Sequence, residues 1–182
     1  MNIIYETERL IIRRWEDDDC QDLFEYAGDE SVTKFLNFPT YQSLKDAKER
    51  IAFLKQQYQE KSVQADYCIE HKATQKVIGA ISNCHYRQEN EGEVEIGYVL
   101  NSKFQGQGFM TEALLGMFKY LKQNKIAKRI IARHDVENIK SGNVMRRAGM
   151  TLEGVLRKAG ANNYHTRHDL ALYSILDEEI RF

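Results

Sequence analysis

Apolar side chains along this chain follow two different spacings, and the change from one to the other outlines its helices and strands. Residues 10–14 form a short apolar run rich in β-branched side chains, which predicts a strand. After it, Asp17 or Asp18 can cap a helix, and Gly28 is suited to end that helix. The apolar residues of this first helix recur at helical spacing: Cys20, Leu23, Phe24 and Ala27.

A second amphipathic helix is predicted over residues 43–60. Ser43 and Asp46 have the spacing of a capping box, with Asp in the last place. The apolar stripe that follows consists of Ala47, Ile51, Leu54 and Tyr58.

The middle of the chain has the pattern of strands. Residues 65–71, 77–85 and 94–100 are short segments rich in β-branched or aromatic side chains, and polar turns separate them. Three consecutive strands with short connections favour antiparallel hairpins.

Helical spacing returns after Gly108, with Met110, Ala113, Leu114, Met117, Phe118 and Leu121 on one side. A strand is predicted at residues 129–134, which gives a strand, helix, strand crossover. A short helix over residues 139–148, closed by Gly149, precedes strands at 151–156 and 169–176. The order indicates a mixed α/β sheet, with antiparallel strands before one parallel crossover.

Composition favours one domain over residues 1–182. Of the 182 residues 42% are hydrophobic, and Pro39 is the single proline, so no linker marks a second domain. Lys and Arg number 26 against 27 Asp and Glu, which gives a formal charge of -1. Nucleic acid and anionic membranes are therefore not expected partners. A monomer or a homodimer is equally compatible with these data.

The three cysteines, Cys20, Cys68 and Cys84, are an odd number at wide spacing, which fits neither a disulfide framework nor a zinc cluster. The N-terminal segment carries Glu6 where a signal peptide needs an apolar core, and no apolar run approaches the roughly 20 residues of a membrane span. These features predict a cytoplasmic chain. The adjacent pairs His134-Asp135 and His168-Asp169 do not have metal-ligand spacing, so no metal is expected.

A glycine turn, Gln105-Gly106-Gln107-Gly108, stands between a predicted strand and a predicted helix. The first N–H groups of a helix have no partner within it, and glycine permits the positive φ angles that anion-binding turns use. The turn therefore suits a phosphate group, and an empty tight loop is the alternative. Neither a P-loop nor the third glycine of a dinucleotide fingerprint is present.

The turn resembles the coenzyme A motif of the GNAT superfamily of acetyltransferases, Gln/Arg-x-x-Gly-x-Gly/Ala. Gln105 and Gly108 match this motif, whereas Met110 departs from its last position. The resemblance extends in order through residues 7–13, 95–100, 138–141, 147–150 and 169–176. Together these segments are similar to the branch that includes the ribosomal-protein N-terminal alanine and serine acetyltransferases.

The resemblance implies an α+β fold with a central, mostly antiparallel sheet of about seven strands flanked by helices. It also implies a pair of splayed strands that hold coenzyme A, with acetyl-CoA as co-substrate. The residues it places at coenzyme A are Val99, Leu100, Asn101, Gln105, Gly106, Gln107, Gly108, Phe109, Met110, Thr111, Asn138 and Asn143.

The resemblance implies acetyl transfer to an amine and leaves three alternatives for the function of this chain. The acceptor is a protein N-terminal amine, such as that of a ribosomal protein, or a small amine such as a polyamine, amino acid or antibiotic. The third alternative is a coenzyme-A-binding regulatory module without catalysis.

Glu95 is the candidate general base. Strand alternation places Glu95, Gly97 and Val99 on the face opposite Val94 and Ile96. A carboxylate among apolar strand residues is costly unless it is paired or functional, and in similar acetyltransferases a glutamate in this strand acts on the amine. An ordinary salt bridge is the alternative.

Ser141 is the candidate proton donor to the leaving thiolate. Asn138 is expected to cap the helix through the N–H of Ser141. In similar proteins residues on this helix approach the sulfur, and many carry a tyrosine where this chain has Met145. Cys84 is interpreted as core filling rather than as a nucleophile, because direct transfer to the amine needs no acyl-enzyme.

Overall fold

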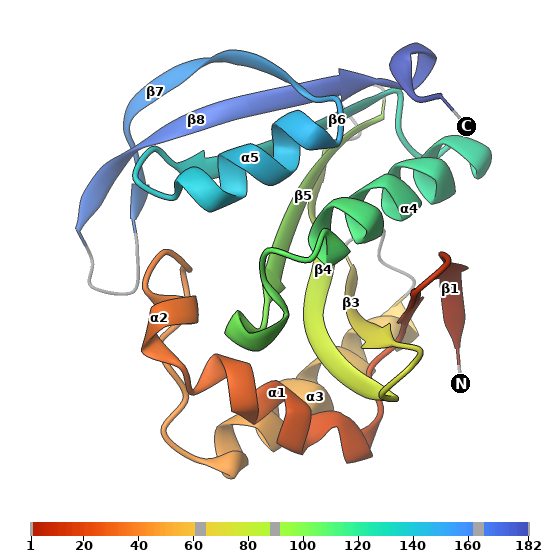
Figure 1. Cartoon of the computed structure of the whole chain (residues 1–182), viewed down its shortest axis with the longest axis vertical. Helices are drawn as coiled ribbons and strands as arrows, with labels where there is room; N and C mark the ends of the chain where they lie inside the picture. The colour runs from red at the N-terminus through yellow and green to blue at the C-terminus, as the bar shows by residue number, and fades with distance from the viewer. Residues whose placement is uncertain (1, 61–64, 88–91, 162–165, 182) are drawn as a thin grey trace.

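A computed structural model describes residues 2–60, 65–87, 92–161 and 166–181 of the 182. Figure 1 shows one sheet with helices on its faces. The eight strands lie in the order β1-β2-β3-β4-β5-β6-β8-β7. Their bounds are β1 Ile3–Glu6, β2 Leu10–Arg13, β3 Ala65–His71, β4 Lys76–Arg87, β5 Glu93–Leu100, β6 Arg129–Asp135, β7 Thr151–Ala161 and β8 Arg167–Leu176.

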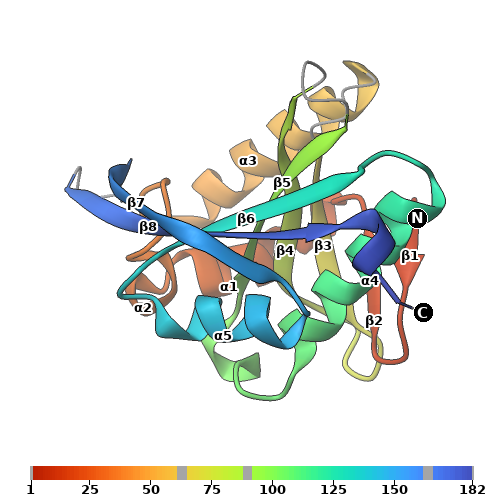
Figure 2. The same ribbon diagram turned by 90° about the horizontal axis from the view of Figure 1, so that it is seen from above.

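Five α-helices occur in the described residues: α1 Cys20–Ala27, α2 Glu30–Thr33, α3 Leu44–Gln57, α4 Phe109–Gln123 and α5 Ile139–Arg147. Short 3-10 helices lie at Asp17–Asp19, Tyr58–Glu60, Ser102–Phe104 and Asp177–Glu179. Figure 2 shows α3 on one side of the sheet and α4 with α5 on the other. None of the described helices is long and apolar enough to cross a bilayer.

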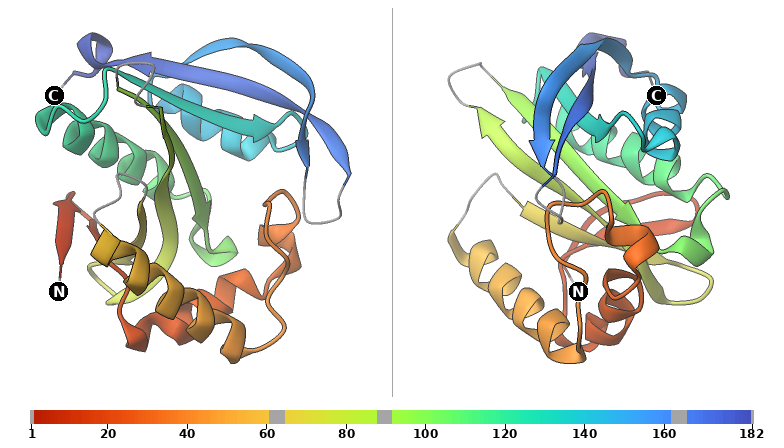
Figure 3. Two further views of the ribbon diagram at one scale, coloured as in Figure 1. Left: turned by 180° about the vertical axis from the view of Figure 1, so that it is seen from behind. Right: turned by 90° about the vertical axis from the view of Figure 1, so that its left-hand side faces the viewer.

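The sheet consists of two parts that meet at β5 and β6. Each pairing is antiparallel except that between β5 and β6, which is parallel and joins Glu93–Glu95 to residues 129–131. Beyond Glu95 the two strands part. In Figure 1 and in the left view of Figure 3, β3, β4 and β5 run along the molecule whereas β6, β8 and β7 run across one end of it. This confirms the predicted parallel crossover and the splayed strand pair.

The predicted elements are present, and the structure differs from the prediction at several points, three of which follow. The sheet has eight strands instead of about seven, because Ile3–Glu6 forms an edge strand against β2. The first helix begins at Cys20, after the 3-10 turn Asp17–Asp19, so neither Asp17 nor Asp18 is its cap. The strand predicted at 151–156 extends to Ala161, because pairing with β8 continues through polar and glycine residues that interrupt the apolar pattern.

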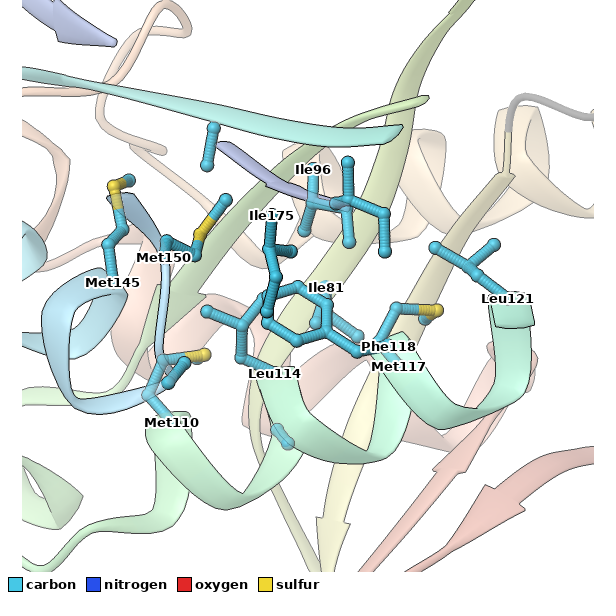
Figure 4. Packing of buried hydrophobic residues seen from close by; sticks show 14 of the residues in the cluster. Ile81, Ile96, Met110, Leu114, Met117, Phe118, Leu121, Met145, Met150 and Ile175 are labelled. Carbon is cyan, nitrogen blue, oxygen red and sulfur yellow. The ribbon is translucent and has the colours of Figure 1, made fainter. Parts of the chain in front are cut away.

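Two apolar clusters fill the two faces of the sheet. The cluster beneath α1 and α3 includes Trp15, Tyr26 and Ile51. The larger cluster lies against α4 and α5, and Figure 4 shows part of it: Ile81, Ile96, Met110, Leu114, Met117, Phe118, Leu121, Met145, Met150 and Ile175. Met110 is 4% exposed and therefore packs in the core behind the glycine turn. Burial of a side chain of this size stabilises the fold by roughly 1.5–3 kcal/mol.

A buried ionic cluster joins β2 to its neighbours. The Arg13 guanidinium donates to Asp19 through Nη1 and Nη2, at 2.7 and 2.8 Å, and to Glu70 through Nε at 2.7 Å. The hydrogen bond to Asp19 is the largest influence on Arg13 and raises its pKa, against the opposing effect of burial. Asp19 therefore links β2 to the start of α1, while Glu70 links it to β3.

Candidate active site

The glycine turn requires glycine because of its backbone conformation. Gly106 has φ of 79° and Gly108 has φ of 81°, in the left-handed region that other residues rarely adopt. A Cβ at Gly106 would meet nothing within 4 Å, and at Gly108 the nearest atom would be the Arg9 Nη2 at 3.6 Å. Any residue other than glycine would thus strain the backbone of the turn, but its Cβ would not clash with neighbouring atoms. The space outside the turn is open.

The backbone N–H groups of residues 106–111 form no hydrogen bond with any acceptor in the described part of the chain. They lie at the N-terminus of α4, whose first internal bond runs from the Glu112 N–H to the Gly108 carbonyl. Residues 106–108 are exposed. Several unpaired donors and the positive end of a 15-residue helix dipole therefore face solvent together, which is the arrangement that binds phosphate.

Arg9 supports the turn from the N-terminal segment, a role that the sequence pattern does not indicate. Its guanidinium lies 4.3 Å from the centre of the Phe109 ring, and Nη1 donates to the Gln107 carbonyl at 3.2 Å. Its Nε donates to the Glu112 carboxylate at 2.6 Å. The segment containing Arg9 is therefore tied directly to the first turn of α4.

The Glu112 carboxylate accepts several hydrogen bonds from the N-terminal segment. It also accepts the Thr7 hydroxyl at 2.5 Å and the Arg9 backbone N–H at 2.9 Å. Partial burial opposes ionisation of the Glu112 carboxyl, but the hydrogen bonds from Thr7 and Arg9 outweigh it and lower its pKa.

Two of the residues expected at coenzyme A hold the loop together instead of facing outward. Gln105 donates from Nε2 to the Leu100 carbonyl at 3.1 Å and accepts from the Lys140 ammonium at 3.1 Å, so it bridges β5 and α5. Asn101 is 4% exposed. Its amide donates to Glu25 at 3.2 Å and its oxygen accepts the Lys103 N–H at 3.0 Å.

The parting of β5 and β6 leaves a cavity of about 330 Å³. Its walls come from β5, β6, the start of α5, the β7–β8 hairpin and the segment after α2. Prominent among the lining residues are Asn37, Glu95, Gly97, Tyr98, Arg133, His134, Asp135, Asn138, Ser141, Gly160 and His168. The two candidate catalytic residues, Glu95 and Ser141, thus line one cavity from opposite elements.

Glu95 forms a two-point ion pair. Arg133 donates from Nε to one carboxylate oxygen and from Nη2 to the other, each at 2.8 Å. The predicted alternation is confirmed, because Val94 and Ile96 are buried in the core while Glu95 lies on the opposite face with Arg133. The salt bridge that the sequence analysis gave as an alternative is therefore present, and the same carboxylate still lines the cavity.

Ser141 has a phenol for a neighbour. The Tyr98 Oη lies 3.0 Å from the Ser141 Oγ and donates to the Ser141 carbonyl at 3.0 Å. Burial raises the pKa of the Tyr98 phenol, and the Ser141 hydrogen bond opposes that effect. The Asn138 side chain accepts the Ser141 N–H at 3.3 Å, so the predicted cap is confirmed. Tyr98 was missed because alternation placed it with the apolar core residues.

Two histidines also line the cavity, each seated against a glycine. The His134 Nδ1 lies 2.7 Å from the Asp135 carbonyl, and its Nε2 would lie 2.7 Å from a Cβ at Gly142. The His168 Nδ1 lies 3.5 Å from the Asp135 carboxylate, and its Nε2 would lie 2.4 Å from a Cβ at Gly160. Asp135 thus pairs with a histidine from another strand, which spacing along the chain does not reveal.

The remaining predicted residues lie elsewhere. Asn143 does not line the cavity, and its side-chain oxygen accepts from Arg146. Met145 is 1% exposed and packs in the core, so it does not face the cavity. Val99 packs toward α1 and α3. The side chain of Cys84 lies outside the described residues.

Neither metal binding nor a cysteine pair is evident in the described residues. No three of their His, Cys, Asp and Glu side chains gather as a metal site would require. Cys20 and Cys68 are free thiols, and burial raises the pKa of the Cys68 thiol.

Comparison with known proteins identifies the family. Residues 9–151 match the family model described as the acetyltransferase (GNAT) domain. The chain is 32% identical over 173 residues to the Bacillus subtilis (strain 168) protein named "Uncharacterized N-acetyltransferase YnaD", covering 95% of this chain and 96% of the relative. It is 33% identical over 105 residues to the Escherichia coli (strain K12) ribosomal-protein-serine acetyltransferase, covering 57% and 58% of the two chains.

The fold also matches a solved structure that contains coenzyme A. That structure is RimL, a ribosomal L7/L12 alpha-N-protein acetyltransferase in complex with coenzyme A, with a TM-score of 0.84 and 24% identity. The superposition covers 97% of this chain and 99% of the other. Together with the family match over residues 9–151, this shows that the chain belongs to the GNAT family of acetyltransferases.

Proposed function

We propose that this protein transfers the acetyl group of acetyl-CoA directly to a primary amine, and that the protein N-terminal α-amine is its acceptor class. The observation that carries the proposal is the row of unpartnered N–H groups at residues 106–111, placed next to the parting of β5 and β6. Acetyl-CoA, when bound, supplies the activated acetyl thioester. The chain supplies an anion site, a free strand edge and a polar cavity.

The phosphate groups fit the glycine turn. A pyrophosphate can accept several hydrogen bonds from residues 106–111, and the open space above Gly106 and Gly108 admits it. A neighbouring hollow of about 500 Å³ along α4 is lined in part by Gly108, Lys119 and Arg147, and also by Glu8 and Glu112. The positive charges of Lys119 and Arg147 would attract the phosphate groups of the same ligand, whereas the carboxylate of Glu8 would oppose them. The carboxylate of Glu112 is paired with Arg9.

The amide groups of pantetheine fit the gap between the strands. β5 pairs with β4 along one edge through Leu100, while its other edge is released from β6 after Glu95. A released strand edge presents main-chain donors and acceptors that an extended ligand can use as a further strand would. The proposed coenzyme A residues are those at the end of β5 and in the glycine turn, with Asn138, which lines the cavity, and Asn143, further along α5.

The cavity is suited to the two proton movements of the reaction. An alkylammonium has a reference pKa of about 8 at an α-amino terminus, so a base must assist at neutral pH. Glu95 is the proposed base, since its carboxylate lines the cavity and the two hydrogen bonds from Arg133 hold it in place there. Ser141 is the proposed donor to the leaving sulfur from the opposite wall.

The choice of a protein N-terminus as acceptor is supported by relatives named for acting on ribosomal proteins. The test measures release of free coenzyme A thiol, with acetyl-CoA at saturation, against N-terminal peptides and a panel of small amines. Turnover of peptides supports the proposal. Turnover of small amines alone would replace its acceptor class, and no thiol release with any acceptor, despite coenzyme A binding, would leave a binding module without catalysis.

A further inference from the structure

Resting on the proposed function, we infer that Tyr98 is a positioning residue that holds the hydroxyl of Ser141 in place to donate a hydrogen bond to the departing sulfur. One side chain comes from β5, which is one of the two parting strands, and the other from the first turn of α5. Both line the cavity.

The geometry restricts the Ser141 hydroxyl. The Tyr98 oxygen lies 3.0 Å from both the Ser141 Oγ and the Ser141 carbonyl oxygen, so one phenol contacts the serine at two points. A phenol has one proton to donate, and its oxygen also accepts. The phenol proton lies between two acceptors, the Ser141 carbonyl and the Ser141 Oγ, and when the two share it the serine proton is directed away from the phenol. The hydroxyl then has its proton free for an acceptor in the cavity.

The phenol acts as a hydrogen-bond donor and not as a source of protons. Burial raises the pKa of Tyr98, so its O–H remains protonated throughout the neutral range. A buried donor of this kind costs free energy when it is left without an acceptor, which favours keeping the contact with Ser141.

The C–S bond of the thioester breaks without a proton leaving the side chain of Tyr98 or of Ser141. As the amine nitrogen bonds to the acetyl carbon, the electron pair of the breaking C–S bond passes to sulfur. The sulfur accepts the hydrogen bond from Ser141, whose oxygen accepts from Tyr98. The proton of the amine passes to Glu95, and the thiolate takes up a proton from water when coenzyme A is released.

No other phenol occupies this place in the described cavity wall. Tyr98 is the one tyrosine among the residues that line it, and Met145 of α5 is buried in the core. Tyr98 approaches Ser141 from β5, so the phenol reaches the first turn of α5 from a different element.

The test uses coenzyme A bound to the full chain, in the absence of an acceptor. The thiolate of bound coenzyme A absorbs in the ultraviolet, so a pH titration measures the pKa of its thiol. If Tyr98 acts on the sulfur through the Ser141 hydroxyl, Tyr98→Phe should raise that pKa by about one unit, a tenfold change. Ser141→Ala should raise it similarly, and the double variant should add little.

Kinetics supply a second measurement. Tyr98→Phe should lower kcat about tenfold with little change in KM for acetyl-CoA, because the interaction strengthens as charge develops on sulfur. Tyr120→Phe removes a hydroxyl from α4, outside the residues that line the cavity, and serves as the matched control. Circular dichroism verifies that each variant is folded.

The outcomes separate this inference from the proposed function. Coenzyme A binding with an unchanged thiol pKa in Tyr98→Phe overturns the assignment of Tyr98 alone. The same holds if Tyr98→Phe and Ser141→Ala act independently. If the unaltered protein does not bind coenzyme A, the proposed function fails, and this inference fails with it.

Discussion

Both oxygens of the Glu95 carboxylate accept hydrogen bonds from one guanidinium, that of Arg133, at 2.8 Å each. The two residues lie on the adjacent strands β5 and β6, just where those strands begin to part. Arg133 therefore fixes the direction of the carboxylate relative to the cavity. A base held in this way keeps one orientation relative to the cavity.

Replacing Glu95 should change the pH dependence of turnover. Glu95→Gln keeps the shape of the side chain but removes its ability to take a proton, so kcat should fall by about 10²-fold near neutral pH. The loss should shrink at high pH, where the amine is already neutral. A pH–rate profile of the variant parallel to that of the unaltered protein would remove Glu95 as the base.

Replacing Gly108 should weaken coenzyme A binding. Gly108→Asp adds a negative charge beside the unpartnered N–H groups, and affinity measured by calorimetry should fall more than tenfold. Gly108→Ala is the matched control, because it adds the backbone strain of φ 81° without the charge. Equal affinity of the Asp and Ala variants would contradict an anion site at this turn.

Acid should weaken the contact between the N-terminal segment and α4. The hydrogen bonds from Thr7 and Arg9 lower the pKa of Glu112 in the folded protein, despite partial burial. The stabilisation that ionised Glu112 provides is therefore fully present above the pKa of a glutamate in the unfolded chain, about 4.3. It is lost as the pH falls through the pKa of Glu112 in the folded protein. Urea unfolding should show Glu112→Gln less stable at pH 7, with the difference disappearing in acid. A difference that persists in acid would contradict this linkage.

Removing Arg13 should be strongly destabilising. Arg13→Leu leaves the Asp19 and Glu70 carboxylates buried without their partner, which costs about 3–5 kcal/mol in the free energy of unfolding. Lys45→Gln is the control, because Lys45 pairs with Glu49 on an exposed helix face and should change stability by less than about 0.5 kcal/mol. Denaturant titrations measure both, and similar effects would contradict a structural role for the buried cluster.

Residues whose partners are close in sequence were predictable. The Ser43–Asp46 capping box, the Asn138 cap on Ser141 and the alternation around Glu95 each follow from local spacing, and the structure contains all three. The parallel crossover also follows from the order of strand, helix and strand. Local geometry determines these features, and one sequence is enough to read them.

Residues whose partners are distant in sequence were not predictable. Arg9 reaches Glu112 across more than a hundred residues, and Asp135 meets His168 because β8 lies beside β6. Strand β1 was missed because it is a four-residue edge strand in which no residue is fully buried, so its pattern carries little signal. Such features depend on which strands become neighbours, and that depends on the whole fold.

The parallel join between β5 and β6 spans three residue pairs, from Glu93 with Arg129 to Glu95 with Ile131. The strands separate after this join, and α4, which follows β5 through the glycine turn and leads into β6, packs against β1, β2 and α5. That helix therefore connects the two parts of the sheet by a second route. A ligand bound at its first turn would contact the segment that joins one part of the sheet to the other.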